Sequence, residues 1–544
     1  MKRRTFLQAG AMTCAVTIAE PRVNLAIENE QVSNAAPKPF ELDELTINDL
    51  QQGLRTGKYS SRSLVRKYLE RIAEIDRDGP RLNSVIEINP DAEEITETLD
   101  RERKENRIRG PLHGIPILIK DNIDTADRML TTAGSLALVN SRPSDDAYVV
   151  KRLREAGAVI IGKTNLSEWA NFRSTKSSSG WSARGGQTKN PYVLDRNPCG
   201  SSSGSGAAIS ANLCAAAIGT ETDGSIVCPS SANGLVGIKP TLGVVSRSGI
   251  IPIAHSQDTA GPMARSVADA VILLTAIAGT DADDPITKTG AGKIEKDYTR
   301  FLDPNGLRGA RIGIARKSFG FNDHVEKVMT GLIAEIKKLG AVIVDPADIP
   351  TAGKFDDTEF EVLLYEFKAD LNTYLKGRRS NSTARSLKEL IEFNEKNRDR
   401  EMPYFGQEIF TRAQAKGPLT HRTYRQALRR NHLLTRTQGI DAVMRRHQLD
   451  ALIAPTGGPA WPTDLINGDH FTGGYSSASA VAGYPHITVP AGYVFGLPFG
   501  ISFFGAAFSE PKLIRYAYAF EQATKIRRTP AFQLTVNLAP GVED

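Results

Sequence analysis

Three side chains in the first half of the chain are of the types that could together hydrolyse an amide. They are Lys120 at the end of 114-GIPILIKDN-122, Ser201 in 198-PCGSSSGSGAA-208 and Ser225 in 219-GTETDGSIVCP-229. A serine hydroxyl becomes a nucleophile when a base takes its proton, and a lysine serves as that base only where burial disfavours its charged form. The apolar residues before Lys120 would provide such surroundings. Each motif alone is a weak signal, but together they indicate acyl transfer by serine.

These segments resemble those of the amidase signature family, whose members hydrolyse carboxylic amides with a Ser-Ser-Lys triad. The two serines are 24 residues apart, as in that family. The resemblance implies that Ser225 is the nucleophile, Ser201 the bridging serine and Lys120 the base. It extends over roughly residues 40 to 525, through segments such as 234-GLVGIKPTLGVVSRSGIIP-252 and 482-AGYPHITVPAGYVFGLPFGISFFG-505.

The same resemblance implies further features of the site. The Gly200-Ser201 peptide bond is expected to be cis, and Ser202 is expected to support the lysine as a hydrogen-bond donor. Glycines in the nucleophile loop allow a tight backbone, so that successive N–H groups can converge on one oxygen. The N–H groups expected to form this oxyanion hole belong to Thr222, Asp223, Gly224 and Ser225.

A carboxylate next to the lysine would favour the lysine's charged form, and Asp121 directly follows Lys120. Successive side chains of a strand point to opposite faces, so we expect Asp121 to point away from the amine of Lys120. The lysine can then lose its proton when it is buried.

The nucleophile loop departs from the common family form GTDTGGSIR, because it reads GTETDGSIV. Asp223 stands where glycine is usual, and Val227 replaces an arginine that meets an acidic substrate in some members. The loss of that cation disfavours a carboxylate on the acyl part. Together with 178-SSGWSARGGQTKNPYVLDRNPCGSSSGSGAA-208, the loop is similar to that of bacterial peptide amidases, which release ammonia from C-terminally amidated peptides. The expected substrate is a neutral, peptide-like amide, with aryl or fatty amides as the alternative.

Other functions stay open. The glutamine-hydrolysing component of the tRNA-dependent amidotransferase shares the signature fold, but it works in the cytosol with a partner and tRNA. A binding protein that keeps a decayed amidase scaffold is the non-enzymatic alternative, and the intact triad counts against it. The eight histidines raise the alternative of a Ser-His hydrolase or a metal site, but they show no HxxxH or HxxE spacing. We therefore expect structural or surface roles for His113, His255 and His486, and no metal or cofactor.

The first residues, 2-KRRTFLQAGAMTCAVTIA-19, place paired arginines before a short apolar stretch, which is typical of a twin-arginine export signal. Cleavage after Ala19 or Ala26 fits a small-x-small pattern. The apolar stretch is shorter than the roughly 20 residues that span a bilayer. We expect an exported protein, periplasmic or secreted, without stable membrane association. The sequence does not determine its oligomeric state.

The formal net charge of +6 argues against a nucleic-acid partner, because residues 2–4 supply half of it and no polybasic run follows. Removal of the signal would leave Cys199, Cys214 and Cys228, an odd number. No complete disulfide framework can be drawn from them, and we expect three small buried thiols.

Apolar runs alternate with amphipathic segments along most of the chain. Strands are expected at 115–119, 158–162, 311–315, 450–455 and 486–492, and helices at 61–77, 91–107, 147–157, 265–279 and 359–375. Buried strands alternating with helices predict the α/β class, with a central mixed β-sheet covered by helices on both faces.

The domain boundaries follow from shifts in composition. We expect an export signal at 1–26, a polar tether at 27–40, one amidase domain at 41–530 and a C-terminal tail at 531–544. Between about 355 and 448 the chain becomes rich in charged and aromatic residues at helical spacing, which indicates a helical insertion beside the substrate site.

Overall fold

A single large mixed β-sheet forms the centre of the computed structural model, which describes residues 38–378 and 383–538. The expected export signal at 1–26 lies outside the described residues. In spatial order the strands of the sheet are β1 (Val85–Ile88), β3 (Val159–Thr164), β2 (Pro116–Lys120), β6 (Ala216–Glu221), β8 (Thr259–Ala264), β7 (Val236–Lys239), β12 (His486–Val494), β13 (Leu497–Phe504), β11 (Ala451–Pro455), β9 (Arg311–Ile314) and β10 (Val342–Val344).

Three neighbouring strands in one half of the sheet run parallel, namely β3, β2 and β6. Every residue of these strands is buried, which explains why they read as continuous apolar runs in the sequence. The carboxyl ends of parallel strands meet at one edge of a sheet, where α/β proteins commonly place their sites. Lys120, Thr164 and Glu221 end these three strands and so come together at that edge.

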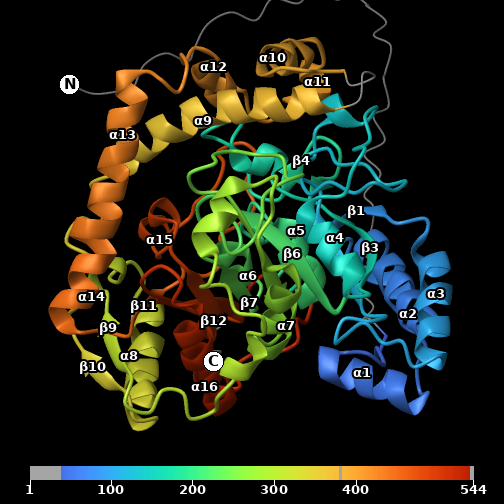
Figure 1. Ribbon diagram of the computed structural model, residues 1–544, viewed down its shortest axis with the longest axis horizontal. Coiled ribbons are helices and arrows are strands. Elements are labelled where there is room, and N and C mark those ends of the chain that lie inside the picture. Colours follow the sequence, from blue (N-terminus) through green and yellow to red (C-terminus); the bar gives the residue numbers. More distant parts are fainter. Residues whose placement is uncertain (1–37, 379–382, 539–544) are drawn as a thin grey trace, which may run out of the picture.

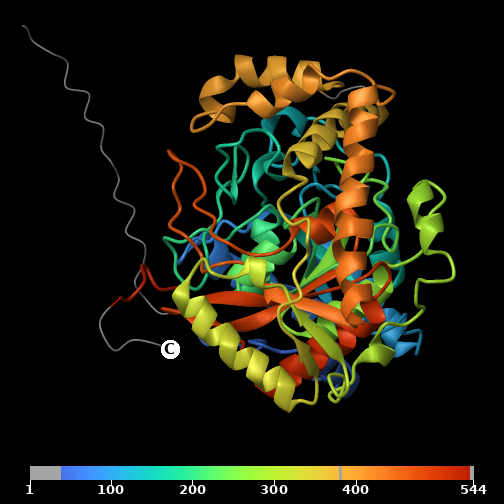
Figure 2. The same ribbon diagram turned by 90° about the vertical axis from the view of Figure 1, so that its left-hand side faces the viewer.

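Helices pack against the strands, α5 (Ser203–Ser210) and α6 (Val227–Ala232) among them. In Figure 2, α8 (Asp323–Lys338) runs diagonally below the strands and the insertion helices lie above them. The helices outside the insertion are α1 (Ile47–Thr56), α2 (Ser61–Ile72), α3 (Ala92–Lys104), α4 (Tyr148–Glu155), α5 (Ser203–Ser210), α6 (Val227–Ala232), α7 (Val267–Ile277), α8 (Asp323–Lys338), α15 (Ser477–Ala482) and α16 (Glu510–Thr524). Both the α/β class and the mixed central sheet are confirmed.

The segment expected as a helical insertion lies between β10 and β11. It contains α9 (Asp356–Gly377), α10 (Leu387–Lys396), α11 (Arg398–Glu401), α12 (Glu408–Gln414), α13 (Arg422–His432), a π-helix (Leu433–Ile440) and α14 (Asp441–His447). In Figure 1, α9 runs across the top of the molecule and α13 stands along one side. A separate hydrophobic cluster joins α9 and α12 to a core loop, through the ring contacts Phe172–Phe367 and Trp169–Phe410.

Both ends of the described chain pack against the domain. Phe40, in the range expected as a tether, packs against Tyr68 of α2. In the expected C-terminal tail, the backbone of Gln533 pairs with Leu194 and Tyr192 of the core. None of the helices within 38–378 and 383–538 is both long enough and apolar enough to cross a bilayer.

Candidate active site

Lys120 is completely buried at the carboxyl end of β2. Its Nζ donates to the hydroxyl of Ser201 at 2.8 Å and to Oγ1 of Thr220 at 2.9 Å. Burial lowers the pKa of Lys120 to about 7, although the carboxylates of Glu221 and Asp258 favour the charged form. A substantial part of the Lys120 population therefore carries no charge at neutral pH.

Asp121 has no part in this contact. Its carboxylate accepts hydrogen bonds from the hydroxyl of Thr132 and from the backbone N–H of Gly134, on the other side of the strand. Arg184 lies 3.4 Å away from the same carboxylate. The expected alternation of side chains is confirmed.

Two other lysines are buried as deeply but contact neither serine loop. Lys163 donates to the carbonyl of Ile123 and to the hydroxyl of Thr131. Lys239 donates to the carbonyl of Pro240. Lys120 is thus the buried lysine whose amine contacts a serine hydroxyl of the glycine-rich loops.

Ser201 lies in the loop that leads into α5, and it is fully buried. The Gly200-Ser201 peptide bond is cis, as the family resemblance implies. The carbonyl of Ser201 accepts from the backbone N–H of Ser167 at 3.1 Å. A Cβ on Gly200 would lie 2.2 Å from the hydroxyl of Ser167, so only glycine fits between the two segments.

Ser225 follows β6 in a tight turn, and the turn is held by a side chain that the sequence did not single out. Oε2 of Glu221 accepts from the backbone N–H groups of Ile226 at 2.8 Å and Val227 at 3.1 Å. Gly224 has a φ of 78°, a left-handed conformation that glycine adopts without strain. Ser225 is 9% exposed whereas Lys120 and Ser201 are inaccessible, so Ser225 is the member of the trio that solvent reaches.

The turn leaves several backbone donors available. Within the described chain, the N–H groups of Asp223, Gly224 and Ser225 donate to no other group. The hydroxyl of Thr222 donates to Asp258 at 2.6 Å, which anchors the start of the turn. Unpartnered N–H groups next to a reachable hydroxyl are what an oxyanion hole requires.

Thr220 connects the two serine loops to the lysine, although sequence reasoning did not identify it. Its hydroxyl accepts from Lys120 and from Nδ2 of Asn122 at 2.9 Å. The hydroxyl of Ser202 donates to the Thr220 carbonyl, which also accepts from Lys120 at 3.3 Å. Ser202 therefore reaches the lysine only through Thr220. The loops also meet directly, because the backbone N–H of Ser202 donates to the carbonyl of Ser225 at 3.2 Å.

The prediction of three unpaired thiols is wrong, because Cys199 and Cys228 form a disulfide. Cys214 alone stays free among the cysteines of the described residues, and it is buried. An odd number of cysteines excludes a complete framework but not a single pair. The two cysteines flank loops that fold against one another, a proximity in space that sequence spacing does not reveal.

The loop between β11 and α15 contacts both serine-bearing loops. The hydroxyl of Ser476 donates to Asp223 at 2.5 Å, next to the turn that carries Ser225. Trp461 of the same loop packs against Cys199, and its Nε1 donates to Asp469. Asp469 in turn accepts from the hydroxyl of Ser179 at 2.5 Å.

A cavity of about 330 Å³ lies behind the nucleophile turn. Its walls include Asn122 and Thr220, which contact each other beside the lysine, and Thr222. Lys120, Ser201 and Ser225 do not line it. The cavity therefore lies next to the catalytic trio, but the side chains of the trio do not form its walls.

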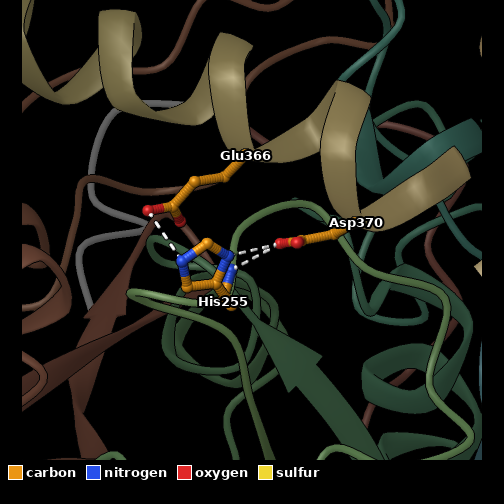
Figure 3. A group of neighbouring side chains, drawn as sticks. All are labelled: His255, Glu366 and Asp370. Carbon is orange, nitrogen blue, oxygen red and sulfur yellow. Dashed lines mark hydrogen bonds and ion pairs between the residues drawn. The ribbon is translucent and has the colours of Figure 1, made fainter. Parts of the chain in front are cut away.

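His255 sits at the rim of this cavity, between two carboxylates of α9 (Figure 3). Its Nδ1 is 2.8 Å from Asp370 and its Nε2 is 3.3 Å from Glu366. Burial lowers the pKa of His255, but Asp370 and Glu366 outweigh this effect and raise it above its ordinary value. One ligand atom from each of the three side chains lies within 4.8 Å of the other two, so the group is compact enough to hold a metal ion, and the two carboxylates also favour the protonated imidazole.

The other two histidines singled out from the sequence have structural roles, as expected. His113 is buried, and its Nε2 lies 3.0 Å from the carbonyl of Leu99. His486 is buried in β12, where Nε2 contacts the hydroxyl of Ser502 at 2.6 Å, and burial lowers the pKa of His486 to about 3.

Comparisons with known proteins agree on one family. A family model described as Amidase matches residues 63–514. A probable amidase of Arabidopsis thaliana is 46% identical over 502 residues, covering 91% of this chain and 92% of the plant protein. A glutamyl-tRNA(Gln) amidotransferase component from Caldanaerobacter subterraneus is 34% identical over 505 residues, covering 90% of this chain and 99% of that protein.

The solved structures include a native peptide amidase from Stenotrophomonas maltophilia, with 53% identity and a TM-score of 0.87. The match covers 91% of this chain and all of the peptide amidase chain. Since the family model and these relatives span nearly the whole domain, the chain belongs to the amidase signature family and is an amide hydrolase.

Proposed function

We propose that the protein hydrolyses neutral, peptide-like amides through an acyl-enzyme on Ser225, with Ser201 and Lys120 as the proton relay. The observation that carries this proposal is the completely buried amine of Lys120, 2.8 Å from the hydroxyl of Ser201. A buried amine with a pKa of about 7 is matched to proton transfer at neutral pH.

In the acylation step, the neutral amine of Lys120 accepts the proton of Ser201 while Ser201 accepts that of Ser225. The Oγ of Ser225 bonds to the amide carbon, and the carbonyl oxygen takes up negative charge. The free N–H groups of Asp223, Gly224 and Ser225 are available to that oxygen, together with Thr222 of the same turn. Such donors stabilise the charge most where water is excluded.

Breakdown of this intermediate breaks the carbon–nitrogen bond. The proton held by Lys120 returns through Ser201 to the leaving nitrogen, which departs as ammonia or an amine. Water then attacks the acyl carbon while its proton passes through Ser201 to Lys120. As the ester bond to Ser225 breaks, that proton returns through Ser201 to Oγ of Ser225, and the acid is released. Each proton removed is returned, so the cycle needs no cofactor.

The preference for peptide amides is supported by two observations. The chain is 53% identical to the peptide amidase of Stenotrophomonas maltophilia, and another structure of a peptide amidase, at 54% identity, is a complex with the competitive inhibitor chymostatin. Val227 is buried after the nucleophile turn and offers no cation to an acidic acyl group. Aryl or fatty amides are the second candidate class. A role in a tRNA-dependent amidotransferase is less well supported, because identity to that relative is only 34%.

The decisive experiment compares the wild type with Ser225→Ala on a panel of amides. We expect ammonia release from C-terminally amidated peptides by the wild type and none by the variant, which should remain folded. A fluorophosphonate should label the wild type once, at Ser225. Glutamine hydrolysis that depends on an added partner protein would favour the amidotransferase function. Activity of Ser225→Ala equal to that of the wild type would refute the assignment of the nucleophile.

We further propose that the protein is exported by the twin-arginine route, on the basis of Arg3 and Arg4 before a short apolar stretch. The Cys199–Cys228 disulfide supports this location, because disulfides persist in oxidising compartments and are rare in the cytosol.

A further inference from the structure

The Cys199–Cys228 disulfide bridges the two loops that carry the serine pair. Cys199 is two residues before Ser201, and Cys228 is three residues after Ser225. The Cα atoms of the two cysteines are 5.9 Å apart, within the normal range for a disulfide. Each end of this covalent link is thus next to a residue of the proposed proton relay.

Hydrogen bonds connect each cysteine to the turn that contains its serine. The backbone N–H of Cys228 donates to the carbonyl of Gly224 at 2.7 Å, which closes the turn around Ser225. The carbonyl of Cys199 accepts from the hydroxyl of Ser203 at 2.6 Å, which closes the turn around Ser201. Movement of either cysteine would therefore displace the serine in the same turn.

Noncovalent contacts also link the two loops, including the hydrogen bond from the Ser202 N–H to the Ser225 carbonyl. The amide of Asn233 spans the two segments, donating to the carbonyls of Pro198 at 2.8 Å and Pro229 at 2.7 Å. Trp461 packs against Cys199, while Cys228 stays partly exposed. Cys228 is thus the less buried of the two bridged residues.

We propose that this disulfide is a positioning element of the catalytic centre, which holds Ser201 and Ser225 in register for proton transfer. The inference rests on the function proposed above. Reduction by two equivalents of a thiol breaks the S–S bond, forms two S–H groups and oxidises the reagent to its own disulfide. The reduced enzyme stays folded, because the sheet and its core do not depend on this link, but its two loops are held less firmly.

The first test is the double variant Cys199→Ala/Cys228→Ala, with Cys214→Ala as the matched control. Cys214 is buried and free, so its loss changes a cysteine without touching the link. Misplacement of reacting groups by about 1 Å can lower a rate up to roughly 100-fold, and we expect a fall in kcat of roughly tenfold. KM should change by less than about twofold, because substrate binding is retained. Fluorophosphonate labelling of the double variant should slow in parallel with kcat.

The second test reduces the wild type with dithiothreitol under native conditions, with alkylation and mass measurement to count the thiols. Its kcat should fall to that of the double variant and recover on reoxidation, whereas the double variant should not respond to dithiothreitol. If reduced wild type or the folded double variant keeps the wild-type kcat, even with a lower Tm, the disulfide only stabilises the fold. Unfolding of the reduced wild type at the assay temperature would equally overturn the proposal.

These outcomes are separable from failure of the proposed function. If the oxidised wild type hydrolyses no amide, or if Ser225→Ala is fully active, the function is wrong whatever the state of the disulfide.

Discussion

The amine of Lys120 is the group whose protonation should govern the pH dependence of turnover. Burial lowers its pKa to about 7, so the fraction of neutral amine rises as the pH passes through this value. We expect kcat/KM to rise with pH through about 7, since this profile reports the groups of the free enzyme. Lys120→Arg should be inactive across the range, because guanidinium keeps its proton. A rise centred near pH 10 would show that the amine is not desolvated as the geometry implies.

The hydroxyl of Thr220 offers a sharper test of the same relay. Thr220→Val removes an acceptor of the Lys120 amine but preserves the shape of the side chain. Loss of a hydrogen bond to the charged form lowers the pKa of a lysine, so the acid limb of the kcat/KM profile should move to lower pH. We expect kcat to fall roughly tenfold as the lysine loses an orienting contact.

The matched control is Thr220→Ser, which keeps the hydroxyl and should keep the position of the acid limb. Identical profiles for the valine variant and the wild type would mean that Thr220 does not influence the base.

Among the individual site residues, the sequence identified those whose type and local surroundings are themselves distinctive. Lys120 was identified because it ends an apolar run, and the serines because glycine-rich loops surround them. Thr220 and Glu221 were missed, since a threonine and a glutamate near the end of a strand carry no distinctive pattern. The role of Thr220 depends on the parallel pairing of β2 with β6, which brings its hydroxyl to the lysine, and the role of Glu221 depends on the tight turn that follows β6. The disulfide was missed for the same reason.

At the scale of elements, the long α9 helix is attached to the loop before β8 by a charged cluster. His255 bridges Asp370 and Glu366 of that helix, and Tyr424 of α13 donates to Glu366 at 2.7 Å. The guanidinium of Arg247 also faces this group, because it donates to the carbonyl of His255. This cluster should make the docking of the insertion sensitive to pH.

The sign of the effect follows from the raised pKa of His255. A histidine that is more basic in the folded state contributes stability that is fully present below its unfolded pKa of about 6.5 and is lost as the pH rises through the higher, folded value. We expect the Tm of the wild type to exceed that of His255→Gln by roughly 1–3 °C near pH 6, with the gap closing at alkaline pH. The modest size reflects the partial exposure of the imidazole.

Thermal melts at several pH values would measure this gap, with His447→Gln in α14 as the control for loss of a histidine elsewhere. A gap that stays constant with pH would mean that the imidazole contributes packing and not charge.

The elements themselves were predictable where hydrophobic periodicity is strong. The helix expected at 61–77 is observed as α2 followed by a π-helical turn (Ala73–Arg77), and the strands expected at 115–119 and 486–492 match β2 and β12 to within two residues. The order of strands in the sheet was not predictable, because β6 pairs with β2 across about a hundred residues and the pairing leaves no local signal.

At the scale of the whole molecule, one sheet contains strands from both the N-terminal and the C-terminal parts of the domain. Its N-terminal half supplies the lysine and both serines, and its C-terminal half supplies β12 and β13, against which α6 packs. The nucleophile turn is therefore fixed between the two halves, since α6 begins two residues after Ser225. Such a centre requires a completed fold, and twin-arginine export, which transports folded proteins, would deliver it in that form.

Export of the folded chain would also determine the redox state of its cysteines. If the folded chain is exported, Cys199 and Cys228 become oxidised outside the reducing cytosol, whereas buried Cys214 stays a thiol in both compartments. We expect periplasmic protein to have one alkylatable cysteine after denaturation. Replacing Arg3 and Arg4 by lysine should retain the chain in the cytosol with its signal cysteine, Cys14, and all four cysteines reduced. Fractionation followed by alkylation and mass measurement would distinguish the two forms, and equal export of the lysine variant would exclude the twin-arginine route.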